Sequence, residues 1–455
     1  MKGGKAMKKS MLITLTLMVA ITVMLFVVYD GNTLASSEAP KEILFGGTSC
    51  QTGLFAPIGQ GGTFGAKAAV EDINKGGGIF LSKFNTKVPV KLTLLDDQSN
   101  EHKAANLAED LVLRSHIQFL LSPNGIPQTV ATKALVAEKY KIPHVSAVVP
   151  MEPVLAMRAT AETPWQYTWL DAFAIGTPIT DKSDFRYGKG GYTIIDTWSD
   201  MLDKFGDKTN KTFGFFASDD PDGVGWYEGF PAAVKAKYPG YKIIGVENHL
   251  GLFPVGTTDF SATIKKWKSA NVEILWGNSN GPDFGVMRRQ MQTMQFKPKM
   301  IGAARAALMY DDVASWGGNL GYGVGIEIWG HPEMKGAKGW GDTSPRSLAD
   351  RWIAATGQKF NQMVPHGYLT VQILATAIEQ AGTTETKAVQ AALKSLDFTS
   401  IYGRIKFDEN NVTRIPIVFG QWMKDDKGDW ALKIVLSKHD FLPIEADPIF
   451  PIPYD

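Results

Sequence analysis

The feature that most constrains the fold of this chain is a repeated alternation of short apolar runs with longer segments of helical period. From residue 42, apolar runs such as EILFGG and VPVKLTLLDDQ alternate with helical segments such as Phe64–Asn74. The same alternation resumes at TIIDTWSDMLDKFG and continues to KMIGAAR. This pattern predicts parallel sheets wrapped by helices. Because 455 residues exceed one ordinary compact domain, we predict an α/β fold with two doubly wound parallel-sheet lobes.

The expected carboxyl ends of the strands carry the residues that a binding site needs. In open sheets of this kind, ligands bind outside the carboxyl ends of the strands. Those ends are rich in Gly, Ser, Asn and Asp, as in GGTSCQTG, SPNG, SAVVP, ASDDPDG, WGNSNG and GAARA. We therefore expect a ligand cleft between the two lobes.

The N-terminus has the pattern of an export signal. Four lysines precede an apolar run from Met11 to Tyr29, and a small-residue zone ends near Ala35. This pattern predicts a signal peptide over residues 1–35 and a periplasmic protein. The alternative is an uncleaved membrane anchor, since about 18 apolar residues can span a bilayer. No cysteine lies in the cleavage zone, so we expect no lipid attachment.

Charge and cysteine content exclude some functions. The chain has 47 basic and 46 acidic residues, and removal of residues 1–35 leaves 43 basic and 45 acidic residues. Such a balance gives no general attraction to nucleic acid, so we expect no nucleic-acid partner. Cys50 is the only cysteine and forms no intramolecular disulfide; we expect it to be buried and inert at a strand end.

The stretch GLFAPIGQGGTFGAKAAVEDIN, residues 53–74, has the composition of a glycine-rich loop followed by a helix. It is not a dinucleotide motif, because Phe64 follows Gly59 and Gly61 where a third glycine is required. No phosphate-binding GxxxxGK[ST] motif occurs either, and we expect no cofactor. The loop either turns the chain or forms a pocket rim whose backbone N–H groups face a solute.

One motif supports an enzymatic alternative. Residues 277–281, GNSNG, match the G-x-S-x-G nucleophile elbow, with Ser279 as nucleophile and His331, His366 and His439 downstream. No HGGG-like oxyanion segment precedes it, so a serine hydrolase is the secondary interpretation and no catalytic residue is assigned.

Metal sites have no support in the sequence. The seven histidines form no HExxH motif, and the acidic run SDDPDG lacks the terminal Glu of an EF-hand, so we expect no metal. A polar turn at the cleft is the expected role of this acidic run, which contains Asp220 and Asp222.

An aromatic segment, TPWQYTWLDAF, joins the two blocks. Trp165, Tyr167 and Trp169 precede Asp171. These aromatic residues either belong to the core or form a pocket wall that stacks on a flat ligand, with Asp171 accepting from a donor.

The order of these segments resembles the periplasmic solute-binding proteins of the branched-chain amino acid ABC transporter family. The matching segments are TGLFAPIGQGGTFGAKAAVEDINKGGGI, LTLLDDQSNEHKAANLAEDLV, ALVAEKYKIPHVS, GTTDFSATIKKWKSANVEILWGN and AVQAALKSLDFTSIYGRIKFDENN. The resemblance covers nearly the whole chain after residue 41. It implies a type I periplasmic binding fold with three hinge crossings, a monomer, a small-molecule solute and permease subunits as partners. A ligand sensor or chemoreceptor partner of the same fold is the alternative.

The resemblance also implies lobe boundaries and ligand contacts. Lobe one is expected over residues 42–170 and 331–420, lobe two over 171–330 and 421–445, and a C-terminal tail over 446–455. The ligand loops fall on residues 122–129 and 146–150, and hinge-side contacts fall on Trp169 and Asp171. The expected ligand-binding residues are Phe55, Ser122, Asn124, Gly125, Ile126, Val148, Val149, Tyr167, Trp169, Asp171, Asp222, Asn280 and Arg305.

Several of these positions depart from the amino-acid-binding pattern. SPNGIP replaces a serine cluster, SAVVP replaces a small-residue loop with threonine, and a basic residue, Arg305, stands where an acid is expected. Because Arg305 presents a planar fork, we predict a small polar organic ligand with an acidic or acceptor end, rather than leucine, isoleucine or valine. The alternative is that Arg305 pairs with Asp311 or Asp312 on the surface.

Overall fold

The computed structural model describes residues 38–162 and 164–454. The predicted signal peptide or anchor lies outside the described residues. Among the residues that are described, no helix is both long and apolar enough to cross a membrane. Residues from Glu42 onward pack as one unit, which contains both sheets.

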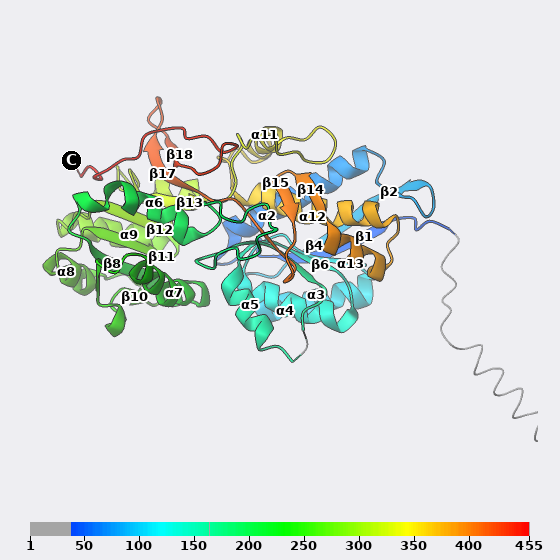
Figure 1. Ribbon diagram of the computed structural model, residues 1–455, viewed down its shortest axis with the longest axis horizontal. Helices are drawn as coiled ribbons and strands as arrows, with labels where there is room; N and C mark the ends of the chain where they lie inside the picture. Colours follow the sequence, from blue (N-terminus) through cyan, green and yellow to red (C-terminus); the bar gives the residue numbers. More distant parts are fainter. Residues whose placement is uncertain (1–37, 163, 455) are drawn as a thin grey trace, which may run out of the picture. The chain divides into compact units, whose positions relative to one another are not determined.

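A six-stranded parallel sheet forms the centre of what we call the first lobe. Its strand order is β16-β7-β6-β5-β1-β4. The bounds are β1 Ile43–Ser49, β4 Val90–Asp96, β5 Phe119–Ser122, β6 His144–Pro150, β7 Thr168–Phe173 and β16 Val412–Arg414. Figure 1 shows α3 (Glu101–Ser115), α4 (Pro127–Tyr140) and α5 (Met151–Ala159) grouped beneath these strands, while α2 (Ala56–Lys75) and α12 (Met363–Ala381) lie above them.

An eight-stranded sheet forms the centre of the second lobe. Its order is β10-β8-β11-β12-β13-β17-β18, with β9 paired to the outer side of β8. The bounds are β8 Thr212–Ser218, β9 Lys242–Ile244, β10 Leu252–Phe253, β11 Ile274–Asn278, β12 Met300–Ala304, β13 Gly325–Ile328, β17 Val418–Lys424 and β18 Trp430–Leu436. Strands β8, β11 and β12 are buried along their whole length, which explains why they are continuous apolar runs in the sequence. The last two strands are antiparallel.

The remaining elements cover the sheets or connect them. In the second lobe these are α6 Ile194–Phe205, α7 Pro221–Lys237, α8 Ser261–Ser269, α9 Gly281–Thr293, α10 Tyr310–Ser315 and the short 3-10 helices η1 Gly206–Lys208 and η2 Val246–Asn248. The others are α11 Pro345–Thr356, α13 Thr386–Ser395 and the hairpins β2 Ile79–Leu81 with β3 Thr86–Val88 and β14 Asp397–Ser400 with β15 Gly403–Lys406.

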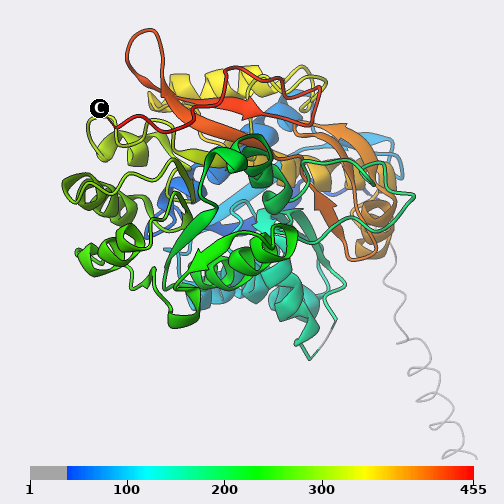
Figure 2. The ribbon, with the colours of Figure 1, turned by 60° about the vertical axis from the view of Figure 1, so that its left-hand side comes forward.

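The chain crosses between the two sheets three times. It leaves the first sheet after β7, returns after β13, and crosses again between β16 and β17. Figures 1 and 2 accordingly show blue and cyan segments of the N-terminal half in one lobe with orange segments from near the C-terminus. The two-lobe α/β fold was thus predicted, but the crossings differ from the expected bounds. Strand pairing keeps residues 171–173 in the first sheet and places residues 418–420 in the second.

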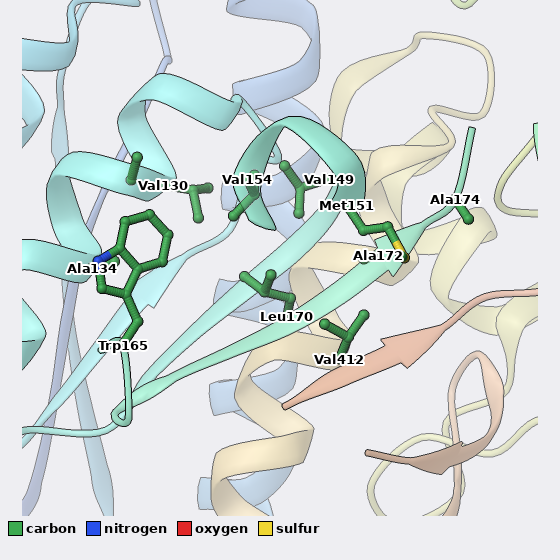
Figure 3. Packing of buried hydrophobic residues seen from close by; sticks show 11 residues of the cluster. Val130, Ala134, Val149, Met151, Val154, Trp165, Leu170, Ala172, Ala174 and Val412 are labelled. Atoms are coloured by element: carbon green, nitrogen blue, oxygen red, sulfur yellow. The ribbon is translucent and has the colours of Figure 1, made fainter. Parts of the chain in front are cut away.

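The core of the first lobe includes two residues from the sequence predictions. Trp165 and Val149 pack with side chains from α4, α5, β7 and β16, as Figure 3 shows. The complete cluster is Val130, Ala131, Ala134, Val149, Met151, Val154, Trp165, Leu170, Ala172, Ala174 and Val412. For Trp165, the core interpretation is the one that the structure supports.

The glycine-rich stretch is not a loop. Helix α2 begins at Ala56, so the glycines expected ahead of a helix form its first turns. A Cβ atom on Gly62 would lie 1.8 Å from the carbonyl oxygen of Pro123, and one on Gly65 would lie 1.9 Å from that of Val364. These glycines therefore let α2 pack closely against α12 and the segment after β5. This finding corrects the interpretation that their backbone N–H groups line a pocket.

Cys50 lies directly after β1 and is buried, as expected. Its Sγ lies 3.2 Å from the carbonyl oxygen of Phe55, and burial raises the pKa of the thiol well above its usual value. Because the thiolate is the reactive form, this environment suppresses reactivity.

Candidate ligand-binding site

A cavity lies at the carboxyl ends of strands from both sheets. This is the position expected for a ligand site in an open α/β fold. We call it the central cavity. Its lining residues are Phe55, Ile58, Gly125, Ile126, Pro127, Val148, Pro150, Phe173, Asp222, Trp226, Asn278, Ala304, Arg305, Glu327, Trp329 and Met363.

The side of the cavity formed by the first lobe is apolar. It carries Ile126 and Pro127 from the segment after β5, and Val148 and Pro150 from β6. Gly125 brings these two segments into backbone contact, because a Cβ atom there would lie 1.3 Å from the carbonyl oxygen of Val148. We call this side the apolar wall; it is set by backbone packing and shape.

The side formed by the second lobe carries ionisable groups, and we call it the charged wall. Asn278 ends β11, Arg305 directly follows β12, Glu327 lies in β13, and Asp222 lies in the first turn of α7. Successive neighbouring strands of one sheet therefore supply this wall. It brings three acidic or basic side chains and one amide to a single cavity.

Arg305 is held by two carboxylates of its own lobe. Its Nη1 and Nη2 donate to the two carboxylate oxygens of Asp220 at 3.2 and 2.6 Å, and Nη1 lies 3.2 Å from Asp222 Oδ2. Burial opposes the charge of Arg305, but the neighbouring Asp222 and Asp220 carboxylates raise its pKa overall. The alternative that Arg305 pairs with Asp311 or Asp312 is therefore wrong.

The backbone at this position is also uncommon. Arg305 has a φ of 39°, a region that few residues other than glycine adopt. Such conformations persist where the surrounding structure imposes them, and they cluster at functional sites.

Of the two acids of the charged wall, Glu327 is fully buried and Asp222 is mostly buried. Burial raises the pKa of Asp222, although Arg305 and a hydrogen bond from Asn278 Nδ2 at 2.8 Å act in the opposite direction. Burial raises the pKa of Glu327 to about 8, and only one of its oxygens has a partner, Trp198 Nε1 at 3.0 Å. Burial without full pairing disfavours the charged form of a carboxyl group, so this wall is costly for the ligand-free protein.

Aromatic rings complete the cavity. Phe173 at the end of β7 stacks on Trp329, with ring centroids 5.1 Å apart, and Trp226 of α7 is a further lining residue. The Arg305 guanidinium lies 5.5 Å from the centre of the Phe55 ring, so this residue of the first lobe contacts the charged wall. These rings provide flat apolar surfaces for a small organic molecule.

A second cavity adjoins the first and shares Phe55, Ile58 and Arg305 with it. Asn280, the N-cap of α9, and Asp312 line this second cavity. Burial raises the pKa of Asp312 to about 6.

The structure brings only part of the predicted site together. The predicted residues that line the central cavity are Phe55, Gly125, Ile126, Val148, Asp222 and Arg305. Asn280 lines the adjoining cavity instead. The remaining predicted residues are not part of either lining, namely Ser122, Asn124, Val149, Tyr167, Trp169 and Asp171.

Specific contacts hold these residues elsewhere. Trp169 Nε1 donates to Gln390 at 2.6 Å, and Tyr167 packs beside a core cluster between α3 and α4. Ser122 Oγ lies 2.7 Å from His144 Nε2. Asn124 is fully buried, but neither polar atom of its side chain has a hydrogen-bond partner in the part of the chain that the structure describes. Trp169 and Tyr167 therefore do not form a cavity wall on which a flat ligand could stack. The aromatic residues that line the cavity are Trp226, Trp329, Phe173 and Phe55.

Asp171 does not line the cavity but contacts His366, which in turn contacts the backbone of the lining residue Trp329. Its Oδ2 lies 2.7 Å from Nδ1 of His366, and Nε2 of His366 lies 3.1 Å from the carbonyl oxygen of Trp329. Both side chains are fully buried. This arrangement connects β7, α12 and the segment after β13 at the position of a cavity residue.

Several lining residues were missed, and one of them left a signal in the sequence. Glu327 is an acid inside the apolar run GVGIEIWG, and a buried acid in a strand is uncommon. Asn278 lies within the motif that we assigned to the hydrolase alternative. No pattern in the sequence distinguishes the lining residues Trp226, Trp329 and Phe173 from aromatic residues of the core.

The serine hydrolase alternative finds no support in the geometry. Ser279 Oγ donates to the Asn280 carbonyl oxygen at 3.3 Å. The three candidate histidines lie near other groups, His331 near Glu445, His366 near Asp171 and His439 near Gly191. Among the described residues, no group of three or more His, Cys, Asp or Glu side chains could hold a metal ion.

Comparisons with known proteins agree with this architecture. The Leu/Ile/Val-binding protein homolog 1 of Brucella abortus is 26% identical over 178 residues, which cover 39% of this chain and 45% of that protein. The chain thus spans less than half the length of the first curated relatives that it matches. The Leu/Ile/Val-binding protein BraC3 of Rhizobium johnstonii is 26% identical over 373 residues, 82% of this chain and 89% of that protein.

A solved structure shows the shared fold. A solute-binding protein of an ABC transporter from Rhodopseudomonas palustris, in complex with 3,4-dihydroxybenzoic acid, superposes with a TM-score of 0.65 at 16% identity, covering 91% of this chain and 99% of that chain. A family model described as periplasmic binding protein matches residues 42–427, most of the chain. The chain therefore belongs to the periplasmic binding protein family.

Proposed function

We propose that the chain is an extracytoplasmic substrate-binding protein of an ABC importer, which captures a small polar organic solute and delivers it to permease subunits. The observation that carries this proposal is the central cavity, because residues from both lobes line it. Relatives named for binding leucine, isoleucine and valine, and a structural neighbour that holds an aromatic acid, support a solute of this size. The proposed role is binding without turnover.

The three crossings suggest how capture occurs. Two lobes joined by three chain connections can rotate about a hinge while each keeps its own core. We propose that residues 42–173 with 331–415 move against residues 175–328 with 418–445, and that the solute is enclosed between the apolar and charged walls. We further propose that the protein is a periplasmic monomer.

Native mass spectrometry of the purified protein tests this function. We expect one retained small molecule per chain, released on denaturation with its mass unchanged after prolonged incubation. Ile126→Trp fills the cavity from the apolar wall and should abolish retention. Leu113→Trp, on the exposed face of α3, is the matched control and should retain the molecule.

Two results would contradict the proposal. One is equal retention by the Ile126→Trp variant, which would place the ligand elsewhere. The other is conversion of the retained molecule to a product, which would make the protein an enzyme. Small-angle scattering supplies an independent test, because saturation with the solute should make the protein more compact.

A further inference from the structure

The charged wall contains acceptor atoms that have no partner. Among the described residues, Oε1 of Glu327 and Oδ1 of Asn278 are buried and make no hydrogen bond. Both residues line the central cavity. Buried polar atoms are almost always satisfied, so two orphan acceptors in one cavity indicate donors that a ligand supplies.

The charges of this wall do not balance. Arg305 carries one positive charge and faces two carboxylates, Asp220 and Asp222. Nη1 and Nη2 of Arg305 each direct an N–H group toward these carboxylates, whose two negative charges exceed its single positive charge, so a ligand carboxylate would meet no net positive charge here. Within the described ranges, Arg305 Nε and Trp329 Nε1 are also unpartnered, so each can still donate one hydrogen bond.

The apolar wall has no side chain that could hold a carboxylate. Its residues contribute aliphatic and proline groups, and the Ser122 hydroxyl, which was predicted for the site, lies beside His144. A zwitterionic ligand needs partners for both of its charges, because an unpaired buried charge is strongly unfavourable. The two walls together suit a molecule with one polar, positively charged end and an apolar remainder.

We propose that the solute of this cavity is an organic monocation with an apolar body and no carboxylate, whose N–H groups bind Glu327 and Asn278 beside Asp222. The proposal rests on the proposed function and deepens it by naming the ligand class. The aromatic rings of Trp226, Trp329 and Phe55 fit the same class, since a cation is attracted to the face of an aromatic ring.

Binding of a cation is then coupled to loss of a proton. Burial raises the pKa of Glu327 to about 8, so this carboxyl group is mostly protonated at pH 7 in the ligand-free protein. The groups that act on its carboxyl are Trp198 on α6 and Asp222 at the start of α7. Arg305, which pairs with Asp220 and Asp222, lines the same cavity, and His366 on α12 lies behind Trp329. On β17 its paired residue is the uncharged Phe419. The arriving cation pairs with ionised Glu327, and the displaced proton passes to the solvent.

Calorimetry with two charge-matched series tests this inference on the full chain. One series is 3-methylbutylammonium, L-leucine and 4-methylpentanoate, which share a branched body and differ in their charged ends. The other is benzamidinium, benzamide and benzoate, which share a planar ring. We expect each cation to bind at least tenfold more tightly than the other members of its series.

Proton release and pH dependence add a readout that needs no variant. Titrations in buffers of different ionisation enthalpy should show about one proton released per cation at pH 7. The affinity for the cations, which stay protonated throughout, should rise about fifty-fold from pH 6 to pH 8 as the ionised fraction of Glu327 increases. Glu327→Gln should weaken cation binding at least tenfold and abolish proton release. Asp312→Asn, which changes a buried acid of the adjoining cavity, is the matched control and should alter neither.

The outcomes separate this inference from the proposed function. Preferential binding of benzoate, 4-methylpentanoate or leucine would overturn the cation proposal but leave a solute receptor. Failure of both cations to bind would also overturn it, while a molecule retained in native mass spectrometry would still support the proposed function. Cation binding that is unaffected by Glu327→Gln would remove Glu327 from the site.

Discussion

The two walls of the central cavity are built on different physical principles. The apolar wall results from close backbone packing around Gly125 and from apolar side chains such as Ile126 and Val148. The charged wall results from strand ends and a helix start that place Asp222, Arg305 and Glu327 side by side. The first wall therefore stabilises the fold and shapes the cavity, whereas the second wall is costly in the absence of a ligand.

This difference indicates that the charged wall determines which ligand is recognised. A wall made of backbone contacts and apolar groups accepts many ligands of similar shape, since apolar contacts discriminate only weakly between such ligands. A wall with orphan polar atoms rejects molecules that cannot pair with them. We therefore expect changes to the charged wall to alter specificity, and changes to the apolar wall to alter shape and stability.

Removal of Arg305 should have the largest effect. Arg305→Leu leaves the mostly buried carboxylates of Asp220 and Asp222 without their cation and should lower the free energy of unfolding by about 3 kcal/mol at pH 7. Urea denaturation measures the loss. Arg346→Leu removes an exposed pair with Glu333 and, as the control, should cost about 1 kcal/mol or less. Equal losses in the two variants would show that the charged wall is not an interdependent cluster.

Neutralisation of Glu327 should stabilise the ligand-free protein. Its pKa is about 8 in the folded protein and 4.5 without the fold, so the stability contributed by this group is fully present below pH 4.5 and is lost as the pH rises through 8. Glu327→Gln should therefore raise the free energy of unfolding by about 3 kcal/mol at pH 7, and by less than about 1 kcal/mol at pH 5. Denaturation at a series of pH values measures this. A variant that is less stable than the natural protein at pH 7 would show that Glu327 supports the fold.

A side chain at Gly62 should disturb the apolar wall. The Cβ atom of Gly62→Ala would lie 1.8 Å from the Pro123 carbonyl oxygen and force α2 away from the segment that carries Ile126. We expect a loss of about 1–3 kcal/mol in the free energy of unfolding and weaker binding of the solute. Gly229→Ala is also within a helix, has no atom within 4 Å of the added Cβ, and should be neutral or stabilising by up to about 1 kcal/mol. Equal behaviour of the two variants would refute the close-packing account of α2.

The smallest effect is expected at Trp169. Trp169→Phe removes one hydrogen bond to Gln390 and should lower the free energy of unfolding by about 1 kcal/mol. The affinity for the solute should not change, because Trp169 does not line the cavity. Calorimetry on the retained solute checks this, with Trp329→Phe as the comparison that should weaken binding. A tenfold loss of affinity in Trp169→Phe would instead support the prediction from the sequence that Trp169 contacts the ligand.

The sequence predicted the fold because its signals are local and repeated. Buried strands such as β8 (Thr212–Ser218) contain apolar runs in the sequence, and a helix follows β8 along the chain. Asp222 and Arg305 were named through the resemblance to a known family, and both lie in segments that follow strands, which gather at one edge of a sheet. The glycine-rich start of α2 was not predicted, because tertiary packing against α12 overrides the low helix propensity of glycine.

The missed and misplaced site residues depend on depth within a strand. Trp169 and Phe173 share one face of β7, but they are four residues apart, which is about 13 Å along a strand. Only Phe173, at the carboxyl end, reaches the cavity. Glu327 was missed because the sequence alone does not show that β13 lies next to β12 in the sheet. Which residues of a strand face a cavity is a property of the assembled sheet.

Hydrogen–deuterium exchange with and without the solute tests the central claim most directly, namely that one ligand is held between the two walls. The account predicts that the solute protects the backbone around Ile126 in the first lobe and around Asp222 and Arg305 in the second lobe together, at the same solute concentration. Protection confined to one lobe, or located away from both walls, would contradict it.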